Sequence, residues 1–232
     1  MSTRRKFFIV FCFILIDAFL LIGFLYIRDA TTINVLKKEV SNLAKLNIMT
    51  DDYNTKIKTS GKYAIVEKSI KEYLNSYAIG VQEISKIVND EQLKNILTYD
   101  NYQADGPNFD KSLAYIEENR SNFNDKIDVL LDSLNEKNMK KYINSKTDDK
   151  YYRSLYVRLI TSDEITASLY PSRDILNKTK VNVNNMYNVS EDVLNYLKAY
   201  QGSWYLENGE IKFNSEDLFN HYTELVAKVK TE

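Results

Sequence analysis

The chain has 232 residues, with 31 basic and 32 acidic side chains and a formal net charge of −1. This near-neutral balance argues against nucleic acid as a partner, because such proteins carry a strongly basic surface. A single cysteine and a single histidine exclude a disulfide-rich scaffold, a His-based catalytic triad and a multi-histidine metal site.

The first element is an apolar run over residues 7–27, which contains one charged residue, Asp17. A helix of this length, at about 1.5 Å per residue, matches the ~30 Å hydrocarbon layer of a bilayer. Three basic residues lie within residues 1–6, so the positive-inside rule places this head in the cytoplasm and residues 28–232 outside. A cleaved signal peptide is the alternative, although its apolar core usually has only about 7–15 residues. The sequence therefore predicts a single-pass signal-anchor in the cell membrane.

Asp17 falls at the middle of the predicted span. A charged aspartate there costs roughly 2.5–3.5 kcal/mol on insertion scales. One interpretation is an intramembrane contact with a partner helix or with a second copy of the chain. The other is a protonated residue that a very apolar segment tolerates.

The remainder of the chain is poor in helix breakers, because the whole sequence has only 6 Gly and 2 Pro. Long helices are therefore expected. Apolar residues three and four apart predict a juxtamembrane helix within residues 28–60, and Thr50-Asp51-Asp52 is typical of another helix start. An outer helical domain is expected over residues 61–232. Its first helix has an apolar stripe from Val66 to Val88, and Lys71 falls on the other faces.

A distinctive segment follows a short predicted helix over about residues 91–99. Residues 101–109 read NYQADGPNF, and Asp-Gly-Pro is a strong turn signal. We predict a loop here, and Asn101, Tyr102 and Asp105 are candidates for a binding surface. The loop mimics part of a calcium-binding loop, but Ser112 stands where the bidentate glutamate is needed. No metal site is predicted.

Further amphipathic helices are expected after this loop, including one that Thr147-Asp148-Asp149 caps and one that starts at Ser190-Glu191-Asp192. Asn208-Gly209 between two alternating segments predicts a β-hairpin near residues 203–213, with Leu206 facing Ile211 and Trp204 facing Phe213. Trp204 joins the candidate binding surface, although a tryptophan here also suits a core. The predicted fold is mainly α: a transmembrane helix, then a helical-bundle ectodomain with a short C-terminal hairpin.

Motifs for nucleophilic catalysis, phosphate binding and zinc binding are absent from the sequence. Carboxylates are scattered along the chain and could in principle form an acid/base pair. An envelope enzyme that uses such a pair is therefore the least favoured hypothesis. We therefore predict no catalytic residues, no cofactor and no enzymatic activity.

Three segments carry a resemblance: GKYAIVEKSIKEYLNSY at 61–77, the NYQADGPNF loop and GSWYLENGEIKF at 202–213. Together they resemble an uncharacterised group of single-pass membrane-anchored proteins from low-GC Gram-positive bacteria. The resemblance spans most of the outer domain and implies the same topology and a helical extracytoplasmic fold. It brings no catalytic residues with it.

These observations predict a membrane-anchored extracytoplasmic interaction or scaffold module for an unknown protein or envelope component. The alternative is a sensor or regulatory subunit that acts through a partner transmembrane helix, with Asp17 as the contact.

Overall fold

The computed structural model describes residues 29–169 and 173–228. The predicted anchor over residues 7–27 and Asp17 lie outside these residues. Within the described ranges, no helix is both long enough and apolar enough to cross a bilayer.

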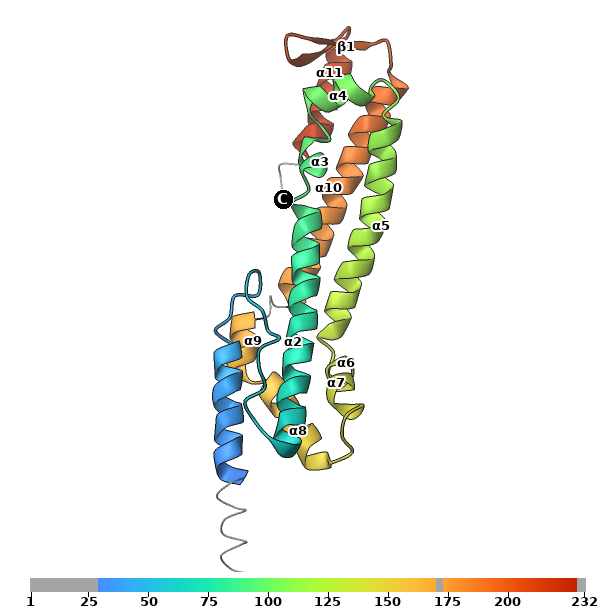
Figure 1. Cartoon of the computed structure of the whole chain (residues 1–232). Helices are drawn as coiled ribbons and strands as arrows, with labels where there is room; N and C mark the ends of the chain where they lie inside the picture. The colour runs from blue at the N-terminus through green and yellow to red at the C-terminus, as the bar shows by residue number, and fades with distance from the viewer. Residues whose placement is uncertain (1–28, 170–172, 229–232) are drawn as a thin grey trace, which may run out of the picture. The chain divides into compact units, whose positions relative to one another are not determined.

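The structure is mainly helical, as predicted (Figure 1). A helix over residues 29–43 opens the described chain. The remaining elements, in chain order, are α2 (Gly61–Val88), α3 (Glu91–Asn95), α4 (Tyr99–Asp105), α5 (Asp110–Ser133), α6 (Glu136–Met139), α7 (Lys141–Asn144), α8 (Lys150–Ile160), α9 (Asp163–Leu169), α10 (Arg173–Ala199), β1 (Trp204–Glu207), β2 (Glu210–Phe213) and α11 (Glu216–Ala227).

The chain divides into two compact units, and the boundary crosses α2. Unit 1 combines the chain up to Asn75 with Met139–Tyr170, and unit 2 combines Ser76–Asn138 with Pro171–Glu232. Each unit is therefore built from two stretches of sequence that are far apart along the chain.

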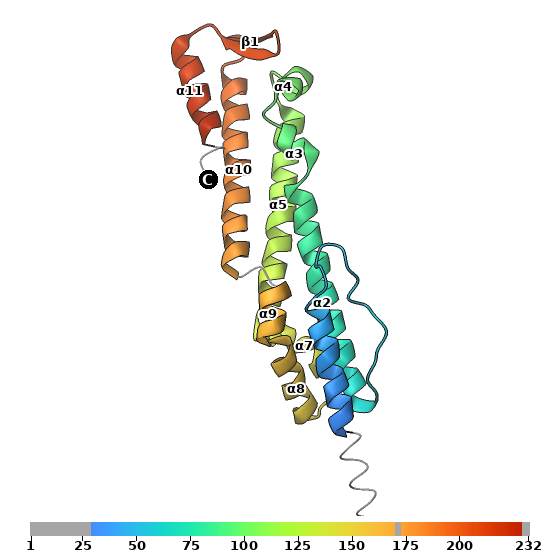
Figure 2. The ribbon, with the colours of Figure 1, turned by 90° about the vertical axis from the view of Figure 1, so that its left-hand side faces the viewer.

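In unit 1, the helix over residues 29–43 runs alongside the first half of α2, and both run in the same direction (Figures 1 and 2). Leu36, Val40 and Leu43 on this helix are buried, as their spacing predicts. The α8 helix closes the core, where the Tyr156 hydroxyl donates a hydrogen bond of 3.0 Å to the Met139 carbonyl.

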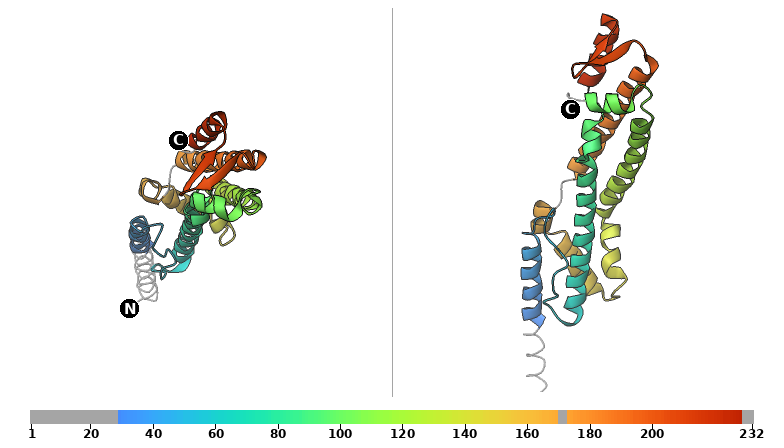
Figure 3. Two further views of the ribbon diagram at one scale, coloured as in Figure 1. Left: turned by 90° about the horizontal axis from the view of Figure 1, so that it is seen from above. Right: turned by 45° about the horizontal axis from the view of Figure 1, so that its top comes forward.

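In unit 2, α5 and α10 pack along each other, and α11 packs on α10 (Figure 2). Phe123 and Ile127 of α5 and Tyr187 and Val193 of α10 are fully buried. Gly80 of α2 approaches α5 so closely that an added Cβ would lie 3.0 Å from Leu130 Cδ1. Figure 3 shows the hairpin, α4 and α11 gathered at one end of α10.

The predicted hairpin is confirmed in register and in turn. Trp204 pairs with Phe213 and Leu206 with Ile211. Asn208 and Gly209 both have positive φ, 50° and 81°, as a type I′ turn requires.

Three local predictions are wrong. Asp51 and Asp52 do not start a helix, because their carboxylates accept hydrogen bonds from the Asn47 and Asn54 amides in local turns and the chain then runs to residue 60 without a helix. Residues 101–105 belong to α4 rather than to a loop, and the turn begins only at Gly106. Ser190 lies inside the continuous helix α10, where it is buried.

Candidate functional site

The α4–α5 turn, the hairpin and α11 form one end of unit 2, which we call the hairpin end (Figure 3). Two of the predicted surface residues, Tyr102 and Trp204, meet there in an aromatic cluster. The Trp204 ring stacks on Phe109 with centroids 6.0 Å apart, and the Tyr102 ring meets Phe109 edge-on at 5.8 Å. Their polar atoms are also used: Trp204 Nε1 donates to the Leu197 carbonyl at 2.7 Å, and the Tyr102 and Tyr222 hydroxyls are 3.1 Å apart.

Burial sets the chemistry of this cluster. Tyr102 is only 3% exposed, and burial, followed by the neighbouring Tyr222, raises the pKa of the Tyr102 phenol well above its usual range. The phenol is therefore neutral at physiological pH. Tyr102 therefore supports the hairpin from inside the protein and does not expose its hydroxyl to solvent.

The other two predicted residues, Asn101 and Asp105, organise the α4–α5 turn. Asn101 Nδ2 donates to the Ile96 carbonyl before α4 at 2.7 Å and to the Ser112 hydroxyl at 3.1 Å. Asp105 Oδ2 accepts from the Ser112 amide at 2.7 Å in the first turn of α5. The turn requires glycine at position 106, because a Cβ added there would lie 2.4 Å from the Tyr102 carbonyl oxygen. The observed contacts of Asn101 and Asp105 are thus within the protein.

An open groove runs over the hairpin and the start of α11, with a volume of about 690 Å³. It is lined by Tyr205, Glu210, Ile211, Lys212, Phe213, Ser215, Glu216 and Phe219. Tyr205 and Phe219 expose 49% and 44% of their surface, which is high for large aromatic residues. The groove was not predicted, yet the alternation of β1 contained the signal, because Tyr205 must point away from the face that holds Trp204 and Leu206.

A second site of interest is the buried ion cluster of unit 1, formed by Glu39, Glu67 and Lys71. These three side chains are 3%, 1% and 2% exposed. Lys71 Nζ lies 2.9 Å from Glu39 Oε1 and 2.6 Å from Glu67 Oε1. The sequence placed Lys71 away from the apolar stripe of α2, so its burial is a correction: the helix over residues 29–43 covers that face.

The segment that precedes α2 completes this cluster. Glu67 accepts hydrogen bonds from the amides of Lys58 and Thr59 at 2.8–3.0 Å, and Lys58 Nζ reaches Glu39 Oε2 at 2.5 Å. Burial alone would raise the pKa of both carboxyls, but hydrogen bonds from these partners outweigh it and hold both pKa values below their usual range. Both carboxylates are therefore ionised and fully engaged.

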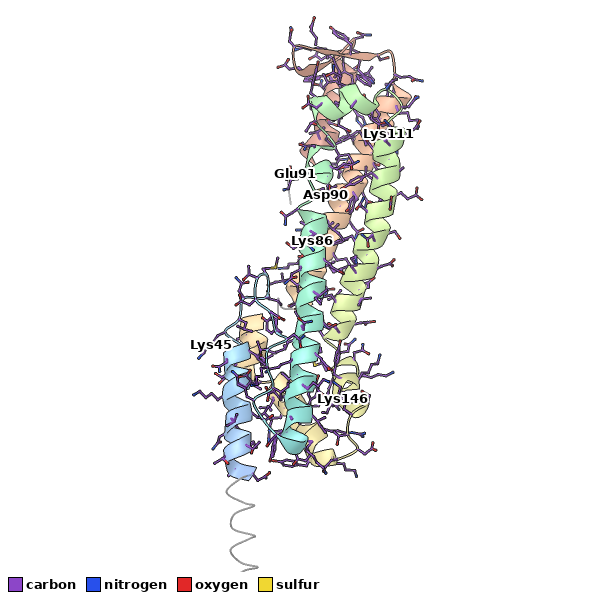
Figure 4. All side chains as sticks on the ribbon, in the orientation of Figure 1. Lys45, Lys86, Asp90, Glu91, Lys111 and Lys146 are labelled. Carbon is purple, nitrogen blue, oxygen red and sulfur yellow. The ribbon has the colours of Figure 1, made fainter. Side chains whose placement is uncertain are left out.

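The contrast with other lysines of the chain is clear. Lys45 in the turn after the helix over residues 29–43, Lys86 on α2 and Lys111 on α5 are exposed to solvent (Figure 4), as lysine normally is. A fully buried lysine between two carboxylates is expensive to desolvate, so removing one partner of the cluster while the others remain is strongly destabilising.

Residues 29–169 and 173–228 hold no group of three or more His, Cys, Asp or Glu side chains placed to bind a metal ion. His221 lies on α11 with its ring 5.0 Å from that of Tyr196. No family model, curated protein or solved structure matches the chain.

Proposed function

We propose that the protein is a membrane-anchored extracytoplasmic interaction module that binds a protein segment in the groove at the hairpin end. Residues 7–27 would hold it in the cell membrane, with residues 1–6 in the cytoplasm. The observation that carries this proposal is the pair of exposed aromatic residues, Tyr205 and Phe219, that line one groove.

The groove is suited to an extended peptide. In the described chain the sheet has two strands, so β2 has β1 along one edge and no strand along the other. A free strand edge can pair with an incoming main chain, while adjacent side-chain pockets give specificity. Exposed tyrosine and other aromatic side chains supply much of the binding energy at such interfaces.

The groove is also backed by a rigid support, because the Trp204–Phe109–Tyr102 cluster fixes the hairpin on α4 and α5. A rigid platform limits the entropy lost on binding. Glu210, Lys212 and Glu216 add charges of both signs to the lining of the groove, and these charges favour a polar, mixed-charge partner over a purely apolar one.

Photocrosslinking in native membranes tests this proposal. A photoreactive phenylalanine analogue is placed in the full chain at Phe219 or at Tyr205, and in a control at Val129, which is 71% exposed on α5. We expect the same protein to be captured at 205 and 219 and to be absent at 129. Identical captures at all three positions, or none at 205 and 219, would contradict a binding groove.

Topology is tested separately, with cysteine labelling. Met49 is 43% exposed, and Cys12 is the only native cysteine, so a Cys12→Ala, Met49→Cys chain carries one thiol. A membrane-impermeant maleimide should label this thiol in intact cells. Labelling only after lysis would contradict the extracytoplasmic placement.

The second candidate function is a sensor or regulatory subunit that signals through a partner helix at Asp17. The buried ion cluster favours it, because it ties the helix over residues 29–43, which directly follows the predicted anchor, to α2. If Asp17→Leu leaves every copurifying membrane protein in place, this candidate loses its basis.

A further inference from the structure

Three tyrosines and a lysine gather where α2 and α8 begin. The rings of Tyr63 and Tyr152 are 5.1 Å apart, and those of Tyr151 and Tyr152 are 5.0 Å apart, both edge-to-face. Lys62 Nζ lies 5.6 Å from the centre of the Tyr152 ring and 2.9 Å from Asp149 Oδ2. Tyr151 is 49% exposed, and the Lys62 side chain is 58% exposed. We call these four residues, Lys62, Tyr63, Tyr151 and Tyr152, the tyrosine cluster.

The tyrosine cluster lies close to Asp29, the first residue of the chain that the structure describes. The helix over residues 29–43 and α2 run side by side in the same direction (Figures 1 and 2), and Glu39 meets Lys71 at 2.9 Å. Moving ten residues back along each helix covers about 15 Å and leads to Asp29 on one and Gly61 on the other. Asp29 therefore lies beside Lys62 and Tyr63. The pKa values of the two tyrosines agree with this placement. Burial raises the pKa of Tyr63 and of Tyr152, and the nearby negative charge of Asp29 raises both pKa values further.

Asp29 is also close to the predicted membrane. The predicted span ends at Ile27, and two residues of even fully extended chain cover at most about 7 Å. The polar layer on each side of the hydrocarbon core is about 5–8 Å thick, since whole bilayers measure about 40–45 Å against ~30 Å for the core. If residues 7–27 span the bilayer, Asp29 lies in or at the edge of the headgroup layer, and the tyrosine cluster lies beside it.

We propose that Tyr151 and Lys62, the exposed members of the tyrosine cluster, form a second membrane-contact surface, which seats unit 1 on the lipid headgroups next to the anchor; Tyr63, 4% exposed, supports them from within unit 1. This inference rests on the proposed function, because it requires the anchor over residues 7–27. Tyrosine rings are enriched at membrane interfaces, where one end of the ring is apolar and the hydroxyl is hydrated. Lys62 adds attraction to anionic headgroups. With two points of contact, unit 1 would be held at a fixed tilt to the bilayer.

The test measures how close the cluster comes to lipid. The full chain in a Cys12→Ala background receives one cysteine, at Tyr151, at its exposed neighbour Lys150, or at Met49. Met49 is 43% exposed, so it is matched to Tyr151 in exposure. It follows the C-terminal end of the helix over residues 29–43, and the length of that helix, about 20 Å, separates its level from the level of Asp29 and the tyrosine cluster. Each thiol carries an environment-sensitive fluorophore. The chains are reconstituted into vesicles of phosphatidylcholine and phosphatidylglycerol that contain headgroup spin-labelled phosphatidylcholine.

We expect strong quenching of the label at 151 and at 150, and little at 49. Flotation of the vesicles reports the anchor independently, and circular dichroism confirms that each variant is folded. Chains that float and show equal quenching at all three positions would overturn the contact surface and leave the anchor intact. Chains that do not float with the vesicles would overturn the anchor, and the contact surface with it.

Discussion

Replacing Lys71 with methionine removes the cation that Glu39 and Glu67 share, while it keeps a similar side-chain volume. All three groups are at most 3% exposed, so water cannot take the place of the missing charge. Removing one partner of a buried ion pair costs about 3–5 kcal/mol, because the remaining charge stays buried without compensation.

The lower end of this range applies here. Glu39 would keep Lys58 Nζ at 2.5 Å, and Glu67 would keep the amides of Lys58 and Thr59. We therefore expect a loss of about 3 kcal/mol. For a chain of this size that loss lowers the melting temperature by roughly 10 °C, since 1 kcal/mol corresponds to about 2–4 °C.

The assay is thermal unfolding of the full chain in detergent micelles, followed by far-UV circular dichroism. Lys68→Met is the matched control, one turn earlier on the same helix. Lys68 is 63% exposed, and its Nζ lies 3.9 Å from Glu72, an exposed pair worth about 0.3–0.5 kcal/mol. The reasoning is refuted if the two variants melt within about 2 °C of each other.

Three further predictions concern stability. Trp204→Ala should lower the free energy of unfolding by about 2–4 kcal/mol, because it removes the ring stack on Phe109 and the hydrogen bond to the Leu197 carbonyl. Tyr205→Ala, on the other face of β1, should lower it by under about 1 kcal/mol. Equal losses in denaturant titrations would contradict the assigned faces of β1. Gly106→Ala should cost about 1–3 kcal/mol, because its Cβ would meet the Tyr102 carbonyl at 2.4 Å, and a wild-type melting temperature would count against this packing. For pH, burial would raise the pKa of Glu67, but the hydrogen bonds from Lys71, from the Thr59 hydroxyl and from the Lys58 and Thr59 amides together outweigh burial and hold that pKa below its usual value. The unfolded carboxyl titrates near ~4.3, so this stabilisation is complete above that pH and is lost as the pH falls through the lower folded pKa. Glu67→Gln should therefore melt with a shallower pH dependence below about pH 5, and an unchanged slope would exclude Glu67 as its source.

Local chemistry explains the predictions that the structure confirms. The hairpin follows from Asn208-Gly209, because positive φ at two successive residues is cheap for few other residue pairs. The start of α8 follows from Asp149, whose carboxylate accepts from the Tyr151 amide at 3.0 Å. The long helix α5 follows from apolar residues three and four apart. Each signal depends only on residues a few positions away.

Apart from the local turns at Asp51 and Asp52, the structure differs from the sequence analysis where residues further away decide the outcome. Lys71 was placed away from the apolar stripe of α2, and its burial was not predicted, because a single helix cannot reveal that a second helix covers its other side. Ser190 carries the chemistry of a helix start, yet it lies within α10, where contacts along the whole helix outweigh a local cap. Tertiary packing also turns two of the predicted surface residues, Tyr102 and Trp204, into the support of the hairpin.

The binding groove was not predicted for the same reason. Its walls come from β1, β2 and the start of α11, and only the folded chain brings Tyr205 and Phe219 to the same space. The sequence identified the hairpin end through Trp204, one residue before Tyr205. It could not show which face of the strand remains open.

We expect the buried ion cluster to set the register between the helix over residues 29–43 and α2. The apolar residues Leu36, Val40 and Leu43 repeat every three or four positions. If this helix shifted along α2 by one turn, about 5.4 Å, a similar apolar contact between the two helices would therefore form. The same shift would carry Glu39 away from Lys71 and leave buried charges unpaired, which costs several kcal/mol. Replacing Glu39, Glu67 and Lys71 together with leucine or methionine should therefore preserve stability while it releases the register. Disulfide crosslinking between single cysteines placed on the two helices distinguishes these states: one pairing in the parent Cys12→Ala chain and several in the triple variant. A single pairing in both would mean that side-chain packing alone sets the register.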